Sequence, residues 1–207
     1  MTYEYVQYGC GLSAPETWLN FDSSPTLRFE RLPVIGRLYT RNAQRFPENV
    51  RYGDIVSGLP IPEAGCRGIY CSHVLEHLSL DEFRIALRNT YAHLRPDGVF
   101  RLVVPDLEHL ARSYLADADA AASIHFLESS GLGTKHRSRR PSALVARALG
   151  TSAHLWMWDE KSMRAELQRA GFRSVRRAAF GDSEDGRFKE VEQVDRFVGA
   201  LAMQCTK

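Results

Sequence analysis

The sequence predicts an α/β fold, namely a doubly wound, mostly parallel sheet of seven strands with an antiparallel final strand. Short β-prone runs alternate with helical segments along the 207 residues, which is typical of a parallel sheet with helices on its faces. Residues 99–104 form a continuous run rich in valine, as expected of a strand buried on both faces. The last two strand candidates have no predicted helix between them, which favours an antiparallel pair.

Seven runs are rich in apolar, aromatic or β-branched residues, and this composition favours strands. They are residues 3–8, 18–21, 50–55, 68–72, 99–104, 172–180 and 197–205. Pro33 and Gly36 break residues 27–45 into short helical pieces, and two prolines make residues 59–62 a loop. Residues 95–98, with the sequence RPDG, are a turn by composition.

The longer helices are predicted from caps and apolar periodicity. Ser79 and Glu82 match a capping box, and apolar residues follow them at helical spacing. A second helix is expected to run through residues 107–126, which include an alanine-rich stretch. A third is capped by Asp159 and stops at Gly171.

The amino-acid composition and the cysteine spacing disfavour several classes of protein. The chain is 44% hydrophobic and 25% charged, and its net charge of +2 favours neither nucleic acid nor a membrane as main partner. No Cys-x-x-Cys pair is present among four cysteines, so we expect no metal site, no disulfide scaffold and a cytoplasmic protein with reduced thiols. Neither a signal sequence nor an apolar run of about 20 residues is visible, and we interpret residues 1–207 as a single domain.

A glycine loop follows the first strand. Residues 9–14 read GCGLSA and fit the G-x-G-x-x-G/A fingerprint of dinucleotide-binding proteins. The residues that follow do not fit an NAD-binding loop, because Pro15 comes directly after it and leaves no room for the expected helix. Two interpretations stay open: a plain turn, or a loop where the backbone approaches a ligand closely.

Two aspartates end predicted strands. Asp22 can accept hydrogen bonds from both hydroxyls of a ribose, or it can be a turn-forming or helix-capping residue. Asp54 can read an adenine edge while Ile55 packs on the ring, or it can be an ordinary aspartate between strand and loop.

A longer pattern is more specific than the glycine loop. The run CSHVLEHL at residues 71–78, followed by LRPDGVF at 94–100, resembles the class I S-adenosylmethionine-dependent methyltransferase superfamily in its type 11-like branch. Further similar segments extend the resemblance over nearly the whole chain: residues 9–11, 18–22, 53–60, 103–107, 154–159 and 170–172. The resemblance implies a Rossmann-like methyltransferase fold and S-adenosyl-L-methionine as cofactor.

The resemblance also implies which residues bind the cofactor. The loop glycines approach its methionine end, the first aspartate binds the ribose, the second borders the adenine with the following isoleucine, and a Ser-His pair lies near the sulfonium. These residues are Gly9, Gly11, Asp22, Asp54, Ile55, Ser72 and His73. Two features depart from the family pattern: the loop is short, and Gln7 and Tyr8 stand where an acidic residue is usual.

Catalytic groups are needed only where the methyl acceptor must lose a proton. Histidine titrates near neutral pH, so His73, His77 and His154 are candidate bases. We predict His73 and Asp106 at the pocket, with His154 as a lesser candidate. The structural alternatives are a hydrogen-bonded, buried His77 and an Asp106 that caps the next helix.

The sequence therefore predicts a methyltransferase that acts on a small-molecule or glycan acceptor. An alternative is a non-catalytic, methyltransferase-like binding or scaffold protein with a degenerate cofactor loop, and a weaker one is a nicotinamide-dependent reductase. An insertion near residues 129–150 carries a basic run at 135–140. This run can be a lid or clamp for an acidic or phosphorylated acceptor, or a solvated loop.

Overall fold

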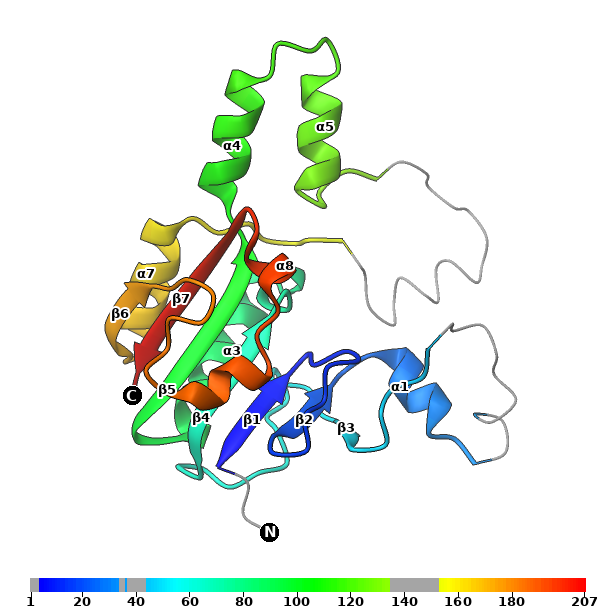
Figure 1. Cartoon of the computed structure of the whole chain (residues 1–207), viewed down its shortest axis with the longest axis vertical. Helices are drawn as coiled ribbons and strands as arrows, with labels where there is room; N and C mark the ends of the chain where they lie inside the picture. Colours follow the sequence, from blue (N-terminus) through cyan, green and yellow to red (C-terminus); the bar gives the residue numbers. More distant parts are fainter. Residues whose placement is uncertain (1–3, 34–35, 37–43, 135–152) are drawn as a thin grey trace.

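The computed structural model describes residues 4–33, 36, 44–134 and 153–207. Seven strands form one sheet in the order β3-β2-β1-β4-β5-β7-β6 (Figure 1). Neighbouring strands are parallel except that β7 runs antiparallel to both β5 and β6, which confirms the predicted fold class. The strands are β1 (Tyr5–Tyr8), β2 (Leu19–Asp22), β3 (Val50–Tyr52), β4 (Cys66–Ser72), β5 (Leu94–Pro105), β6 (Arg173–Arg177) and β7 (Ala200–Thr206).

Two helices with predicted N-caps, α3 and α7, pack on one face of this sheet. The capping box predicted at Ser79 is present, and the predicted cap Asp159 also forms a capping box with Ser162. Phe83 of α3 stacks on Trp158 with ring centroids 4.1 Å apart, inside the main core. Within the described residues the helices are α1 (Pro25–Glu30), η1 (Leu75–His77), α3 (Leu80–His93), α4 (Leu107–Ala116), α5 (Ala122–Ser129), α7 (Glu160–Arg169), η2 (Gly186–Glu190) and α8 (Val194–Phe197).

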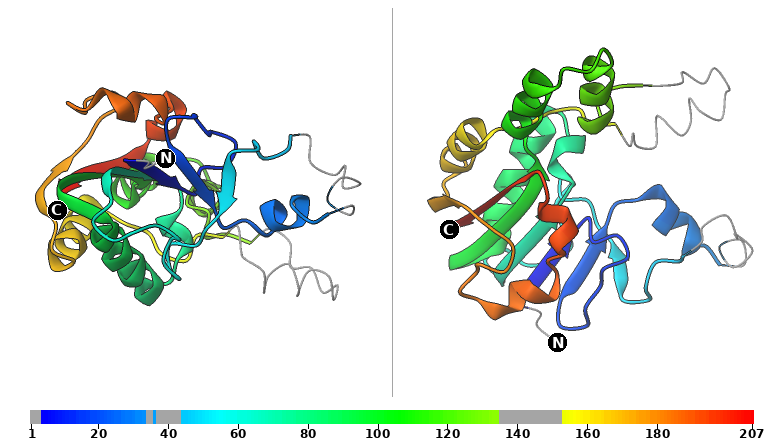
Figure 2. Two further views of the ribbon diagram at one scale, coloured as in Figure 1. Left: turned by 90° about the horizontal axis from the view of Figure 1, so that it is seen from below. Right: turned by 45° about the horizontal axis from the view of Figure 1, so that its top comes forward.

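The opposite face is covered by the segment between β6 and β7. The β1–β2 connection is too short for a helix, and η2 and α8 lie over this face instead (Figure 2, left). Phe188 of η2 contacts Tyr5 and Trp18, whose ring centroids lie 6.5 and 5.6 Å from its own. These rings form a second buried cluster with Val191 and Val103.

A buried arginine fastens this segment to the middle of the sheet. Arg101 of β5 is 1% exposed, and its Nε donates to Glu192 Oε1 at 2.7 Å. Its Nη1 donates to Asp182 at 2.9 Å and to Gln204 at 2.6 Å. The guanidinium also lies over the ring of Phe188. Because the guanidinium binds both ends of the 182–192 segment, it holds that segment against the sheet.

Three expectations about elements are wrong. Residues 95–98 belong to β5 rather than to a turn, because the amide of Asp97 donates to Lys207 and that of Lys207 donates to Gly98. The helix expected over 107–126 is divided into α4 and α5, because Asp117 and Asp119 accept backbone amides in between. The last two strands are joined through η2 and α8 and not directly.

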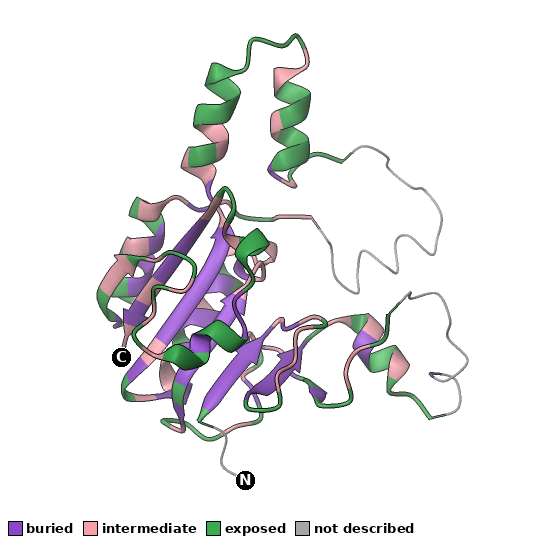
Figure 3. Cartoon of the chain, viewed as in Figure 1, coloured by how far each residue is buried: buried purple, intermediate pink, exposed green. Residues whose placement is uncertain are grey.

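The pair α4 and α5 projects from the rest of the chain (Figure 1). Neither helix contains a buried residue (Figure 3). Leu115 and Ile124 are 81% and 57% exposed. Most of the insertion predicted near 129–150, and the whole basic run at 135–140, lie outside the described residues. Within the described ranges no helix is both long and apolar enough to cross a membrane.

Candidate functional site

The glycine loop follows β1 at the carboxyl edge of the parallel strands. Gly9 and Gly11 both have left-handed φ angles, of 64° and 54°. A Cβ on Gly9 would overlap Cγ2 of Val74, so the position admits only glycine. A Cβ on Gly11 would meet nothing within 4 Å. One glycine therefore permits close packing inside the protein, and the other faces open space.

Two buried amide side chains hold the short connection that follows. Gln7 Nε2 donates to the carbonyl of Ser13 at 2.7 Å and to Asn20 Oδ1 at 2.6 Å. Asn20 Nδ2 donates to the carbonyls of Pro15 and Trp18, each at 3.0 Å. A carboxylate at position 7 cannot donate these hydrogen bonds. The amide of Gln7 is thus required where the family usually has an acidic residue. The only indication of this in the sequence is a polar residue inside each of the two predicted strands.

Asp22 joins the ends of two neighbouring strands. Its Oδ2 accepts the amide of Gly11 at 3.0 Å, and its Oδ1 accepts the amide of Ser24 at 2.7 Å. The residue is 8% exposed. Each carboxylate oxygen has a second lone pair, so Asp22 can hold the loop and still accept a ligand hydroxyl.

A hollow opens beside the glycine loop. It lies between the carboxyl ends of β1 and β4 and the segment that covers the sheet before β7. The hydroxyls of Tyr70 and Ser72 are buried here and have no hydrogen-bond partner among the described residues. Such orphaned hydroxyls in a hollow suit a polar ligand. The walls include Gly9, Cys10, Tyr70, Ser72, Gln193 and Arg196.

The two residues predicted at the adenine, Asp54 and Ile55, follow β3. Asp54 accepts the amide of Val56 at 2.8 Å and the hydroxyl of Ser57 at 3.3 Å, so its carboxylate closes a turn. Ile55 is 4% exposed and belongs to the main core. Neither residue lines the hollow. Their role at an adenine ring stays a prediction.

His73 follows β4 with a left-handed φ of 55°. Its Nδ1 lies 3.2 Å from Glu76 Oε1, and its Nε2 lies 3.1 Å from the carbonyl oxygen of Arg196. Burial alone would lower the pKa of His73, but these two acceptors outweigh burial and raise it. Since Arg196 also lines the hollow, His73 connects the hollow to the buried Glu76.

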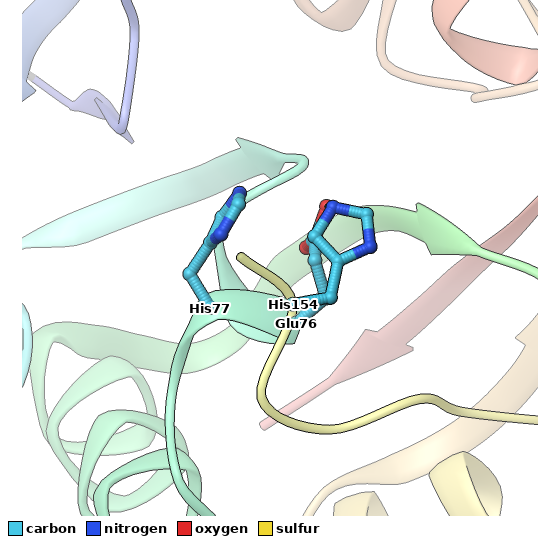
Figure 4. A group of neighbouring side chains, drawn as sticks. All are labelled: Glu76, His77 and His154. Carbon is cyan, nitrogen blue, oxygen red and sulfur yellow. The ribbon is translucent and has the colours of Figure 1, made fainter. Parts of the chain in front are cut away.

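Two more histidines surround Glu76. The side chains of Glu76 and His77 extend from η1, and that of His154 extends from the segment that crosses it (Figure 4). His154 Nε2 lies 3.9 Å from Glu76 Oε1, and the two imidazole centroids are 4.9 Å apart. His77 is half-buried and bonds the carbonyl of Ala153, which fits the structural alternative for it. Glu76 was not predicted as a site residue. The only indication in the sequence is that it is a charged residue within an apolar run.

Asp106 caps α4. Its Oδ1 accepts the amides of Glu108 and His109 at 2.9 and 3.3 Å, and its Oδ2 accepts Arg177 Nη2 at 2.7 Å. It is 3% exposed. Both oxygens therefore serve the fold, and a catalytic role for Asp106 stays a prediction that these contacts do not support.

Comparisons with known proteins identify the family and the fold of the chain. The sequence matches the family model described as a methyltransferase domain over residues 9–176. The fold is similar to that of a SAM-dependent methyltransferase from Archaeoglobus fulgidus, with TM-score 0.50, 14% identity and coverage of 100% of this chain and 88% of that one. It is also similar to a SAM-dependent methyltransferase from Thermotoga maritima, with TM-score 0.52, 15% identity and coverage of 98% and 81%. No curated protein sequence matches the chain.

Proposed function

We propose that this chain, which belongs to the methyltransferase domain family, transfers a methyl group from S-adenosyl-L-methionine to a small-molecule or glycan acceptor. The observation that carries the proposal is the hollow beside the glycine loop. Parallel α/β sheets bind ligands at the carboxyl ends of their strands, and the hollow lies at the ends of two central strands, β1 and β4.

The residues around the hollow fit this cofactor. The open space at Gly11 lets a ligand approach the backbone, and Asp22 keeps lone pairs for ribose hydroxyls. The orphaned hydroxyl of Ser72 can bind the methionine end. S-Adenosyl-L-methionine supplies an electrophilic methyl group on its sulfonium. The protein then has to bind, orient and shield the two reactants.

The side chains of His73 and His154 differ in whether a ring nitrogen is available to accept a proton. Both ring nitrogens of His73 face acceptors, Glu76 and the carbonyl of Arg196. This arrangement favours a role for His73 in positioning the wall of the hollow over a role as general base. His154 donates from Nδ1 to the carbonyl of Ser130, so its Nε2 carries a lone pair. His154 does not line the hollow, so its role as a base stays a prediction.

Calorimetric titration with S-adenosyl-L-methionine tests the cofactor site. We expect saturable binding, and Ser72→Ala is expected to weaken it about 5-fold to 10-fold, the equivalent of one hydrogen bond of about 1–1.5 kcal/mol. Thermal stability should hardly change, because the Ser72 hydroxyl has no partner to lose. Ser113→Ala, at an exposed position of α4, is the matched control. No binding by the unmodified protein at high micromolar cofactor would overturn the proposal.

The short connection and Gln7 favour one alternative, a binding or scaffold protein that keeps the fold without the chemistry. A methyl-transfer screen over sugars and small hydroxylated or amino compounds separates the two functions. Transfer to any acceptor supports the enzyme. Cofactor-independent binding of a partner, together with no effect of S-adenosyl-L-methionine on thermal stability, supports the scaffold.

A further inference from the structure

The carboxylate of Glu76 is in an unusual position. Its side chain is 0% exposed; Oε1 faces Nδ1 of His73 at 3.2 Å, and Oε2 has no hydrogen-bond partner among the described residues. A buried charge with so few partners is costly, and proteins normally compensate it with a cation or a metal ion. The groups nearest to it include the imidazoles of His73 and His154, with Nδ1 and Nε2 at 3.2 and 3.9 Å from Oε1.

The two histidines beside Glu76 have defined tautomers. His154 Nδ1 lies 2.7 Å from the carbonyl oxygen of Ser130, and His77 Nδ1 lies 3.2 Å from that of Ala153. A carbonyl oxygen only accepts, so each Nδ1 is the protonated donor and, in the neutral ring, each Nε2 carries a lone pair. Histidines that bind metals are commonly oriented in this way, with the other ring nitrogen donating to a backbone carbonyl.

The three side chains also lie close enough together to share an ion. One ligand atom from each of Glu76, His77 and His154 lies within 4.8 Å of the other two. In a tetrahedral zinc site with bonds of about 2.1 Å, two ligand atoms lie about 3.4 Å apart. The ligand atoms of these three residues would therefore have to approach one another by up to about 1.4 Å to close around an ion.

We propose that Glu76, His77 and His154 form a binding site for a divalent first-row transition-metal ion such as Zn²⁺. Two imidazole nitrogens and one carboxylate are a ligand set that suits zinc and its neighbours, whereas Mg²⁺ and Ca²⁺ prefer oxygen ligands throughout. The ion compensates the charge of Glu76. It also fastens the segment around His154 to η1, where the amides of Leu155 and Trp156 already donate to the carbonyl of Glu76.

Tag-free protein, stripped of metal by a chelator, is titrated with Zn²⁺ by calorimetry. We expect one ion per chain and a higher midpoint of thermal unfolding when the metal is present. His154→Ala and His77→Ala should each weaken binding at least about tenfold, since even groups that only support a ligand change affinity by about 10–100-fold. His125→Ala removes an exposed histidine far from η1 in the chain and should leave the affinity unchanged.

Glu76→Gln keeps the shape of the side chain and removes its charge. It therefore provides a second test of the site if a histidine variant does not fold. Circular dichroism establishes that each variant is folded. No binding by the unmodified protein at about 100 µM Zn²⁺, or unchanged affinity in folded Glu76→Gln and His154→Ala, would overturn the proposal. The first result would assign the compensation of Glu76 to a protonated His73 instead. Because the readout is metal binding, failure here leaves the test with S-adenosyl-L-methionine unaffected.

Discussion

Two parts of the sheet reach the same parallel arrangement by different means. The unit β4–α3–β5 has a helix between its strands, and that helix begins with a capping box at Ser79. The unit β1–β2 has no helix: the buried amide pair of Gln7 and Asn20 joins its two strands, and Phe188, from far along the chain, covers it at Trp18. The first unit depends on a helix cap between near neighbours in sequence, and the second on buried polar and aromatic contacts between residues further apart. Substitutions at each unit should therefore have different costs.

The largest expected effect comes from the arginine that fastens the covering segment. Arg101→Met should lower the free energy of unfolding by about 3–5 kcal/mol, because Glu192 then stays buried without its cation. Urea denaturation measures the loss. Adding Glu192→Gln to Arg101→Met should restore part of it, and an equal or greater loss in the double variant would contradict this explanation.

Restoring an acidic residue before the glycine loop should be destabilising. Gln7→Glu removes the donor to Ser13 and Asn20 and places a charge in a position that is 2% exposed, at a cost of about 2–3 kcal/mol. Thermal and urea unfolding measure it. The local reference is Ser79→Ala, which removes a helix cap and should cost about 1 kcal/mol. A Gln7→Glu protein as stable as the unmodified one would mean that the amide pair does not hold the connection.

The smallest effect concerns pH. Burial alone would raise the pKa of Asp182, but hydrogen bonds from Arg176, the amide of Ala179 and Arg101 lower it from 3.8 to about 2. A carboxyl with a lowered pKa stabilises the folded state above its unfolded pKa, and this contribution is lost as the pH falls from about 4 to about 2. Asp182 is exposed, so solvent screens the effect. Asp182→Asn should flatten the stability curve in this window, measured by urea unfolding at stepped pH.

The same contrast explains what the sequence could predict. Helix-capping residues, apolar periodicity and the glycines and prolines that interrupt elements correctly predicted all seven strands and the start of α3 and α7. These signals act within a few residues. They failed at residues 95–98, where pairing with Lys207 overrides a turn-like composition. At the site, Gly9 and Ser72 line one hollow and Asp22 accepts the amide of Gly11, and their roles in cofactor binding stay predictions. Glu76 and the covering residues Gln193 and Arg196 were missed, because only the tertiary fold brings them to the site.

The wall that covers the hollow has a consequence for biosynthesis. The glycine loop leaves the ribosome long before Gln193 and Arg196, which follow β6 in the chain. A nascent chain therefore carries an incomplete pocket until the segment before β7 has been translated. Long-range contacts of this kind form late and slowly. Ligand affinity should thus be acquired abruptly once that segment has emerged and β7 enters the sheet between β5 and β6.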